Sequence, residues 1–143
     1  MAITASGLYF LTLEKCLVNT AAIDWEAETN KLALFLDALT PNFDTNSVYS
    51  ATNEASGTGY TAGGKAFTGT EWTVSGGVAT YDSADTTWPS STIANAMAAQ
   101  GYADAVADEL MFLQDFVTAV STTGGTFSVI NHANGIATVD FTP

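Results

Sequence analysis

One segment of the chain has the residue types and spacing of a phosphate-binding loop. Gly59-Tyr-Thr-Ala-Gly-Gly-Lys65 matches Gly-x-x-x-x-Gly-Lys, a pattern in which backbone N–H groups and the lysine hold phosphate oxygens. The context does not fit, because residue 66 is Ala where a Ser or Thr would bind Mg²⁺, and no apolar strand precedes the segment. We therefore interpret it as a glycine-rich surface loop that leads into a strand and is anchored by Tyr60.

Two short acidic segments carry the oxygen ligands that Ca²⁺ prefers. They are Asp44-Thr-Asn46 and Asp82-Ser-Ala-Asp85, and neither has the spacing of the twelve-residue calcium loop. Asp and Asn side chains also accept hydrogen bonds from nearby backbone groups in turns. We expect turns at both segments, and we predict no metal site and no cofactor.

The chain has one cysteine and one histidine, Cys16 and His132, so an internal disulfide is excluded. Lys15 is the one cationic neighbour of Cys16, which is too little to indicate an activated thiolate. The 15 acidic residues include no carboxylate pair in a recognisable glycosidase context. We predict no catalytic residues and expect a protein that is not an enzyme.

The charge balance excludes whole classes of partner. The chain of 143 residues has 15 Asp and Glu, three Lys and no Arg, which gives a net charge of −12. Lys15, Lys31 and Lys65 are too few to form a basic groove for nucleic acid or to bind an anionic membrane. The charged fraction is 13% and the apolar fraction 47%, so the chain is acidic but not of disordered composition.

Length and patterning predict one domain over residues 1–143 that is mainly β. The 22 Thr and 12 Gly favour strands and turns. Apolar residues at helical spacing over residues 8–18, with Cys16 on the apolar stripe, predict a short helix with Ser6 as N-cap. Residues 31–36 predict a buried strand. No apolar run reaches the length of a membrane span, and no positive residue precedes the first apolar stretch, so we expect no secretory signal.

Two hairpins follow from turn residues. Residues 72–74 and 78–81 flank Ser75-Gly76-Gly77, and residues 126–131 and 136–141 flank a turn in which we expect His132 to be exposed. Residues 103–118 fit either a helix or a buried strand at 110–113, and residues 94–108 are helical in character. The fold class expected is an antiparallel β-sandwich or a jelly-roll-like single domain with a short N-terminal helix.

Two features point to contact with another protein. Residues 41–69 are a long polar stretch, and loops of this length are usually functional or ordered by a partner. We expect residues 42–64 and the N-terminal segment to make such contacts. Trp25, Trp72 and Trp88 fit either core packing or an interface, and the sequence leaves both interpretations open.

Several segments, taken in order, resemble a family of small structural proteins of tailed bacteriophages. They are Gly7-Leu-Tyr-Phe, Ile23-Asp-Trp25, Lys31-Leu-Ala-Leu-Phe, Leu39-Thr-Pro-Asn-Phe-Asp-Thr45, Glu54-Ala-Ser-Gly-Thr-Gly-Tyr-Thr-Ala-Gly-Gly-Lys65, Asp82-Ser-Ala-Asp-Thr-Thr-Trp88, Ser91-Thr-Ile93, Gly124-Gly-Thr-Phe-Ser-Val and Gly135-Ile. Together they span most of the chain. The block from Ser56 to Gly64, followed by an Asp and Trp element, is the most specific part.

The resemblance implies a β-rich virion component without catalytic residues. Within that family, the chain is most similar to a capsid decoration, or cement, protein. Such a protein would be made in the host cytoplasm and would bind the major capsid protein on the exterior of the shell. The resemblance also implies a homo-oligomer, a trimer. In the family, the segment after Ser91-Thr-Ile93 resembles consecutive strands, from which the Ala-rich residues 94–108 depart. Two alternatives stay open: a neck, tail or head-fibre component, and a carbohydrate-binding β-sandwich module that stacks Trp72 or Trp88 on sugar rings.

Overall fold

Eleven strands and one helix make up the regular structure of residues 3–140 and 142, which are the residues that the computed structural model describes. In chain order they are β1 (Gly7–Leu8), α1 (Phe10–Leu17), β2 (Lys31–Leu36), β3 (Gly57–Thr58), β4 (Lys65–Ala66), β5 (Glu71–Ser75), β6 (Val78–Asp82), β7 (Thr86–Ile93), β8 (Ala96–Ala103), β9 (Glu109–Val120), β10 (Gly125–Val129) and β11 (Ala137–Asp140). The strands form three antiparallel sheets, with orders β1-β9-β8-β2-β4, β10-β7-β3 and β11-β6-β5. The expected mainly β fold with a short N-terminal helix is confirmed.

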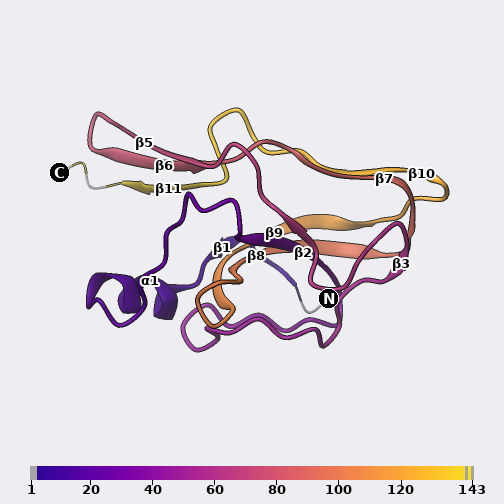
Figure 1. Ribbon diagram of the computed structural model, residues 1–143, viewed down its shortest axis with the longest axis horizontal. Helices are drawn as coiled ribbons and strands as arrows, with labels where there is room; N and C mark the ends of the chain where they lie inside the picture. The colour runs from indigo at the N-terminus through magenta and orange to yellow at the C-terminus, as the bar shows by residue number, and fades with distance from the viewer. Residues whose placement is uncertain (1–2, 141, 143) are drawn as a thin grey trace.

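The five-stranded sheet lies in the middle of the molecule and is covered on both faces (Figure 1). On one face, the two three-stranded sheets contribute Tyr81, Trp88 and Phe127 to a shared core. On the other face, the segment before α1 and the segment after β2 contribute a second core that includes Tyr9 and, at its border, Phe43. The arrangement is sandwich-like, with an added layer of irregular chain.

Helix α1 is confirmed, but its predicted N-cap is wrong. Tyr9 occupies the N-cap position without a side-chain hydrogen bond, and Ser6 Oγ instead accepts a hydrogen bond from the backbone N–H of Asp115 on β9. The helix ends at Leu17 with Val18 as the C-cap, and the next residue, Asn19, has a φ of 57°, the left-handed conformation that follows many helices. Ser6 therefore fastens the N-terminal segment to the sheet.

Residues 96–103 and 109–120 form β8 and β9, with turns over residues 104–108, so the helical interpretation is wrong and the alternative of a buried strand at 110–113 is confirmed. Every residue of β8 is buried, and so are the first five of β9. A strand that is covered on both faces loses the alternation of apolar and polar residues that identifies a strand in a sequence. Gly101 of β8 lies opposite Phe112 of β9, and a Cβ at residue 101 would overlap the Phe112 ring. The consecutive strands that the resemblance implied after Ile93 are present as β8 and β9.

The predicted hairpin of residues 72–81 is confirmed, whereas the predicted hairpin near the C-terminal end is wrong. β5 pairs with β6 around Gly76 and Gly77, whose φ angles of 59° and 85° suit a two-residue turn. β10 and β11 are both strands, but β10 pairs with β7 and β11 pairs with β6. The turn residues between β10 and β11 therefore carry the chain from one sheet to the next. Phe141, the last residue of the predicted strand at 136–141, lies outside the described residues.

Candidate functional site

The segment that resembles a phosphate-binding loop is closed by a carboxylate. Glu54 Oε1 accepts hydrogen bonds from the Gly63 N–H at 2.8 Å and from the Tyr60 hydroxyl at 2.5 Å. The Gly64 N–H donates to Thr61 O, and the Lys65 ammonium donates to Thr87 O. The backbone N–H groups of Tyr60, Gly63 and Gly64 are thus occupied, and the carboxylate would repel an anion. The expected glycine-rich loop with a Tyr60 anchor is confirmed.

Tyrosines around Glu54 extend this network. Tyr49 Oη donates to Glu54 Oε2 at 2.6 Å, Tyr60 Oη accepts from the Leu34 N–H, and Tyr102 Oη donates to Gly63 O. Burial, followed by the hydrogen bond to the Glu54 carboxylate, raises the pKa of Tyr49 and of Tyr60 above the usual value. These hydroxyls are therefore fixed donors, and they hold the polar loop against the five-stranded sheet.

The first acidic segment forms a turn, as predicted, whereas a turn at the second is wrong, because Asp82 ends β6 and residues 83–85 are an irregular link to β7. Asn42 Oδ1 accepts hydrogen bonds from the N–H groups of Asp44 and Thr45, and Asp85 Oδ1 accepts from the Asn131 N–H. In the part of the chain that the structure describes, no group of three or more His, Cys, Asp or Glu side chains is placed to hold a metal ion. Each segment thus has a structural use.

Cys16 and His132 lie on separate elements. Cys16 is half-buried on α1, and His132 is exposed in the turn after β10, where its Nδ1 accepts a hydrogen bond from the Asn134 N–H. Between described residues, no hydrogen bond joins the thiol to the imidazole. Cys16 is less buried than expected for a core residue, whereas the expected exposure of His132 is confirmed.

The tryptophans pack inward. Trp88 is 4% exposed and lies against Tyr60 and Phe127. Trp25 and Trp72 are half-buried and meet each other and Tyr81 with ring centroids 5.4 to 5.8 Å apart. Core packing accounts for all three side chains, and a buried Trp88 has no free face on which a sugar ring can stack.

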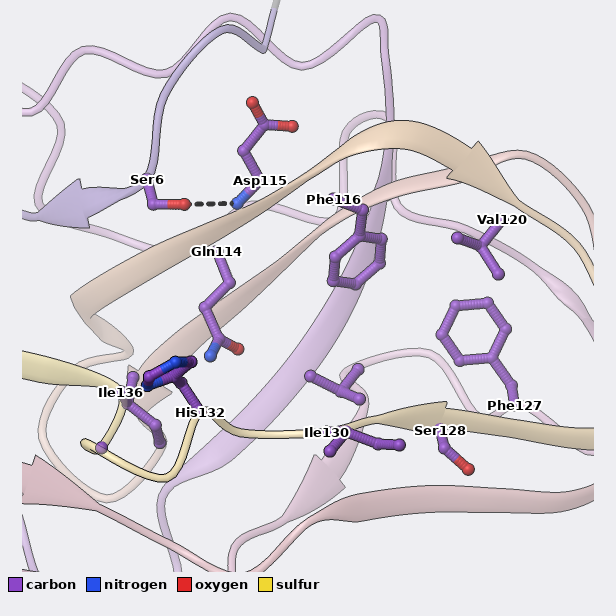
Figure 2. Close-up of a pocket in the computed structure, with 12 residues that line it drawn as sticks. Ser6, Gln114, Asp115, Phe116, Val120, Phe127, Ser128, Ile130, His132 and Ile136 are labelled. Atoms are coloured by element: carbon purple, nitrogen blue, oxygen red, sulfur yellow. Dashed lines mark hydrogen bonds between the residues drawn. The ribbon is translucent and has the colours of Figure 1, made fainter.

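A groove with a mixed apolar and polar lining lies where the sandwich is open at its side, between β9 and the segment that follows β10 (Figure 2). It encloses about 400 Å³ and is lined by residues of both sheets. Phe116 of β9 and Phe127 of β10 point into the space from opposite walls, with ring centroids 6.2 Å apart. Ile130, at the rim, is 74% exposed. We call this hollow the β9–β10 groove.

A second hollow adjoins the first along the same side of the molecule. It encloses about 320 Å³ between β1, the start of α1 and β11, and it shares Ser6 and Ile136 with the β9–β10 groove. Phe10 lines it and is 57% exposed. No lysine lines either hollow, and Asp115 and His132 are the titratable side chains among the lining residues. The combined surface has apolar and polar side chains and few charges.

One polar group in the groove lacks a partner. Gln114 Nε2 donates to Asn131 Oδ1 at 3.2 Å, while Gln114 Oε1 is buried without a hydrogen bond in the described structure. The amide orientation is fixed, because the Asn131 amide nitrogen donates to Ser83 O and so leaves only its oxygen for Gln114. The side chain of Gln114 extends from β9 into the groove (Figure 2).

Comparison with known proteins yields no family model, no curated protein and no solved structure that matches the chain. Among the described residues, no helix is long and apolar enough to cross a membrane. The fold therefore defines the protein as a β-sandwich-like domain, with two adjoining hollows along its open side.

Sequence reasoning missed the two side chains on which these sites depend. Glu54 is one of 15 acidic residues, and nothing in its local sequence distinguishes it. Gln114 lies in a segment whose apolar pattern left helix and strand open, so its direction was undefined. The four residues after Leu110 do not alternate between apolar and polar side chains. Only the pairing of β9 with β8 and β1 therefore decides which of these side chains face the groove.

Proposed function

We propose that this chain is a non-enzymatic structural protein of a tailed-bacteriophage virion, with the role of a capsid decoration protein. It binds the outer surface of the shell formed by the major capsid protein and stabilises that shell. The observation that carries the proposal is the surface formed by the two hollows along the open side of the sandwich. Three of the eight large apolar side chains that are exposed among the described residues line it: Phe10, Val120 and Ile130. Clustered exposure of this kind marks a protein contact surface.

The three lysines and the Glu54 carboxylate all take part in ion pairs or hydrogen bonds within the fold. Lys15 and Lys31 form ion pairs with Glu109 and Asp104, and Lys65 donates to a backbone carbonyl. Glu54 accepts three hydrogen bonds from its own loop and from Tyr49. These contacts support an assembly role, and a net charge of −12 with every lysine engaged disfavours nucleic acid and anionic membranes as partners.

The resemblance to phage virion proteins supplies the identity of the partner and the proposed trimer. The groove offers a surface for such contacts, because apolar side chains are exposed at its rim and few charged side chains line it. A protein on the capsid exterior has no contact with the packaged genome, which is consistent with the acidic composition. A neck, tail or head-fibre position is the second virion assignment, and copy number separates the two.

Localisation and copy number test the proposal. Electron microscopy of virions that carry this chain should place it at repeated positions on the capsid exterior. Because an icosahedral shell repeats each local symmetry position many times, quantitative protein analysis should give on the order of hundreds of copies per particle. A count of about a dozen, as a neck or fibre with few symmetry positions would give, rules out decoration.

A stability measurement tests the cement role separately. Particles stripped of this protein should lose resistance to heat or osmotic shock, and adding back the purified protein should restore it. Particles whose resistance is unchanged after stripping would contradict a stabilising role, even where the protein is found on the shell.

A further inference from the structure

We propose that a hollow between β8 and residues 39–53, which we call the β8 hollow, binds one neutral sugar unit, and that the side-chain amide of Gln100 forms a hydrogen bond with a hydroxyl group of that sugar. The β8 hollow lies at the second core, on the other face of the five-stranded sheet from Phe127. Neither Trp72 nor Trp88 lines it. The inference does not rest on the proposed function, because it assigns a further binding activity to the chain on its own.

The size of the β8 hollow fits a single ring. The irregular chain after β2 covers the sheet here, and the space left between them is about 230 Å³ (Figure 1). Sites for drug-sized ligands are larger, at about 300 to 1,000 Å³. Tyr9, Gln100 and Leu110 line the hollow from the sheet side, and the other lining residues lie between Leu39 and Asn53. The ligand is therefore small and is enclosed between two layers of the protein.

The sheet side of the hollow contains an amide group that is only partly bonded. The Gln100 backbone is paired with Ala33 on β2 and with Leu113 on β9, so the side chain is the part of Gln100 that lines the hollow. Gln100 is 3% exposed, and its Nε2 donates to Tyr9 Oη at 2.5 Å. Among the described residues, no group donates to Gln100 Oε1. A buried amide with a free polar atom at the wall of a hollow is a binding group for a ligand.

The free atom of Gln100 is accessible from the hollow. The fully enclosed side-chain atoms without a partner, within the described part of the chain, are Tyr81 Oη and Gln114 Oε1, and Gln100 Oε1 is not one of them. Exchange of the amide oxygen and nitrogen would let Tyr9 donate to Oε1 and would leave Nε2 free instead. One atom of the Gln100 amide therefore lacks a partner in either orientation, and a ligand hydroxyl satisfies both cases because it donates and accepts.

The opposite side of the hollow offers one donor and one acceptor. Asn46 Oδ1 accepts a hydrogen bond from the Asn42 N–H, which leaves the Asn46 amide nitrogen as a donor. Asn53 Nδ2 donates to the Ala38 carbonyl oxygen, which leaves Asn53 Oδ1 as an acceptor. Both asparagines line the hollow. A sugar carries hydroxyl groups on neighbouring carbons, so it can bond to both kinds of group at once.

The lining argues for a neutral ligand with an apolar face. No Asp, Glu, Lys or His is among the described residues that line the hollow, so a charged ligand would lose its hydration without gaining a counter-charge. Leu39, Val48 and Leu110 form the apolar part of the lining. A sugar ring has C–H groups that can pack against such side chains and hydroxyl groups that can bond to the amides. This mixture fits a sugar better than an ion, a phosphate ester or a wholly apolar molecule.

Sugar titrations of the isolated protein test the site. The probes are glucose, galactose, mannose and N-acetylglucosamine, with glucuronate as an anionic control. In NMR titrations, at least one of the four neutral sugars should shift the Gln100 side-chain amide signals, with a Kd of about 1 mM, the order that a ligand of about a dozen non-hydrogen atoms reaches. Glucuronate should bind at least about tenfold more weakly, because its carboxylate finds no cation in the lining.

Two results of these titrations overturn the inference: no shift with any of the four neutral sugars, and binding of glucuronate as tight as that of the best neutral sugar. Because the titrations use the protein without shells, neither result bears on the decoration role. Loss of shell binding, in turn, would leave the sugar site intact.

Two matched variants test the position of the site. Val48 lines the hollow and is 53% exposed, whereas Val74 on β5 is 76% exposed and lies outside the lining. Val48→Trp should fill the hollow and weaken sugar binding at least about tenfold, while Val74→Trp binds like the wild type. Both residues are exposed, so both variants should fold, which circular dichroism checks. Equal sugar binding by the two variants overturns the β8 hollow as the site.

The hydrogen bond to Gln100 has its own variant. Gln100→Met keeps the length of the side chain and removes both polar atoms, so sugar binding should weaken about tenfold, in line with the loss of one buried hydrogen bond. Gln114→Met is the control, because it removes a buried amide that does not line the hollow, and it should bind sugar like the wild type. Unchanged sugar binding by a folded Gln100→Met contradicts the proposed hydrogen bond. If Gln100→Met does not fold, Val48→Trp and Val74→Trp decide the site.

Methyl glycosides distinguish a free sugar from the end of a glycan. In both a glycan and a methyl glycoside, the anomeric oxygen is bonded to a further carbon. Binding of the methyl glycoside as tight as that of the free sugar supports the site and assigns it to the terminal unit of a glycan. Binding of the free sugar alone supports the site and assigns it to a free monosaccharide. Binding of neither overturns the inference.

Discussion

The polar loop at residues 41–69 and the β9–β10 groove differ in how their chemical groups are used. The loop has little regular structure, yet Glu54, Tyr49, Tyr60 and Tyr102 bind its backbone and one another. The groove is built from regular strands, yet its rim exposes apolar side chains and Gln114 Oε1 has no partner.

The difference shows that an irregular segment can have its polar groups bonded within the chain, while a segment of regular strands leaves a polar group unbonded and apolar side chains exposed. The sequence predicts a loop that is functional or ordered by a partner, and it predicts either a helix or a buried strand within residues 103–118. In the structure, the loop obtains its order from within the chain, and the strands present the surface that another molecule would complete. The predictions below test this contrast, in order of decreasing effect on stability.

Gly64→Ala should have the largest effect. Gly64 has a φ of 75°, and a Cβ there would overlap the Leu32 carbonyl oxygen of β2, so the loop would have to leave the sheet. We expect a loss of at least about 3 kcal/mol in the free energy of unfolding, measured with urea. Gly76→Ala is the matched control, since its φ is 59° and nothing lies within 4 Å, and it should cost about 1 kcal/mol. Equal losses would contradict the close contact.

Glu54→Gln should have the next largest effect. The substitution keeps the shape of the side chain but removes the charge that strengthens its hydrogen bonds to Tyr49, Tyr60 and Gly63. We expect a loss of about 2 kcal/mol in urea unfolding. Glu71→Gln is the control, because Glu71 is exposed and lies directly opposite Asp82, where removal of a like charge costs nothing. A Glu54→Gln variant as stable as Glu71→Gln would show that the loop is held by other contacts.

Alkaline pH should lower the free energy of unfolding, because the folded protein buries several tyrosine hydroxyls. Burial raises the pKa of Tyr9 from 10.0 to about 12, and burial and Glu54 raise that of Tyr60. The unfolded chain then releases protons first, so stability is complete below pH 10 and falls as pH rises toward the folded-state pKa. The slope should be about 1.4 kcal/mol per pH unit for Tyr9.

Urea unfolding at several alkaline pH values measures this slope. Tyr60→Phe should reduce it, because one raised pKa is removed, whatever the variant does to stability at neutral pH. An unchanged slope in Tyr60→Phe would contradict the raised pKa in the folded loop.

Ile130→Thr should have the smallest effect on stability. The side chain is largely exposed, so the free energy of unfolding should change by no more than about 0.5 kcal/mol. The same variant should weaken shell binding if the groove is the docking surface. A loss of stability as large as that of Glu54→Gln would mean that Ile130 supports the fold, and the contrast between loop and groove would fail.

Local patterns predicted part of this architecture. The α1 helix, the strand β2 and the β5–β6 hairpin follow from residues near one another in sequence, such as Gly76 and Gly77. β8 was misread because it is buried on both faces, a fact that depends on layers formed by distant segments. β10 and β11 were paired with each other because the turn between them has hairpin residues, whereas Asn131 binds Ser83 there instead.

The candidate site was less predictable than the fold, for a physical reason. The groove is defined by which strand edges remain open after all pairing is complete, and pairing depends on residues as far apart as Ser6 and Asp115. The Glu54 network likewise joins residues from four separate segments. Nothing in the sequence predicts that these side chains are in contact.

The engagement of all three lysines has a consequence for proteolysis. Trypsin cleaves after lysine or arginine, so this chain offers three target bonds, in α1, β2 and β4. Each of these lysines is also held by its own side-chain contact. Cleavage needs a segment that opens out of its element. Trypsin should therefore leave the folded protein whole and cut it only as these elements open, which makes digestion a direct reporter of local unfolding.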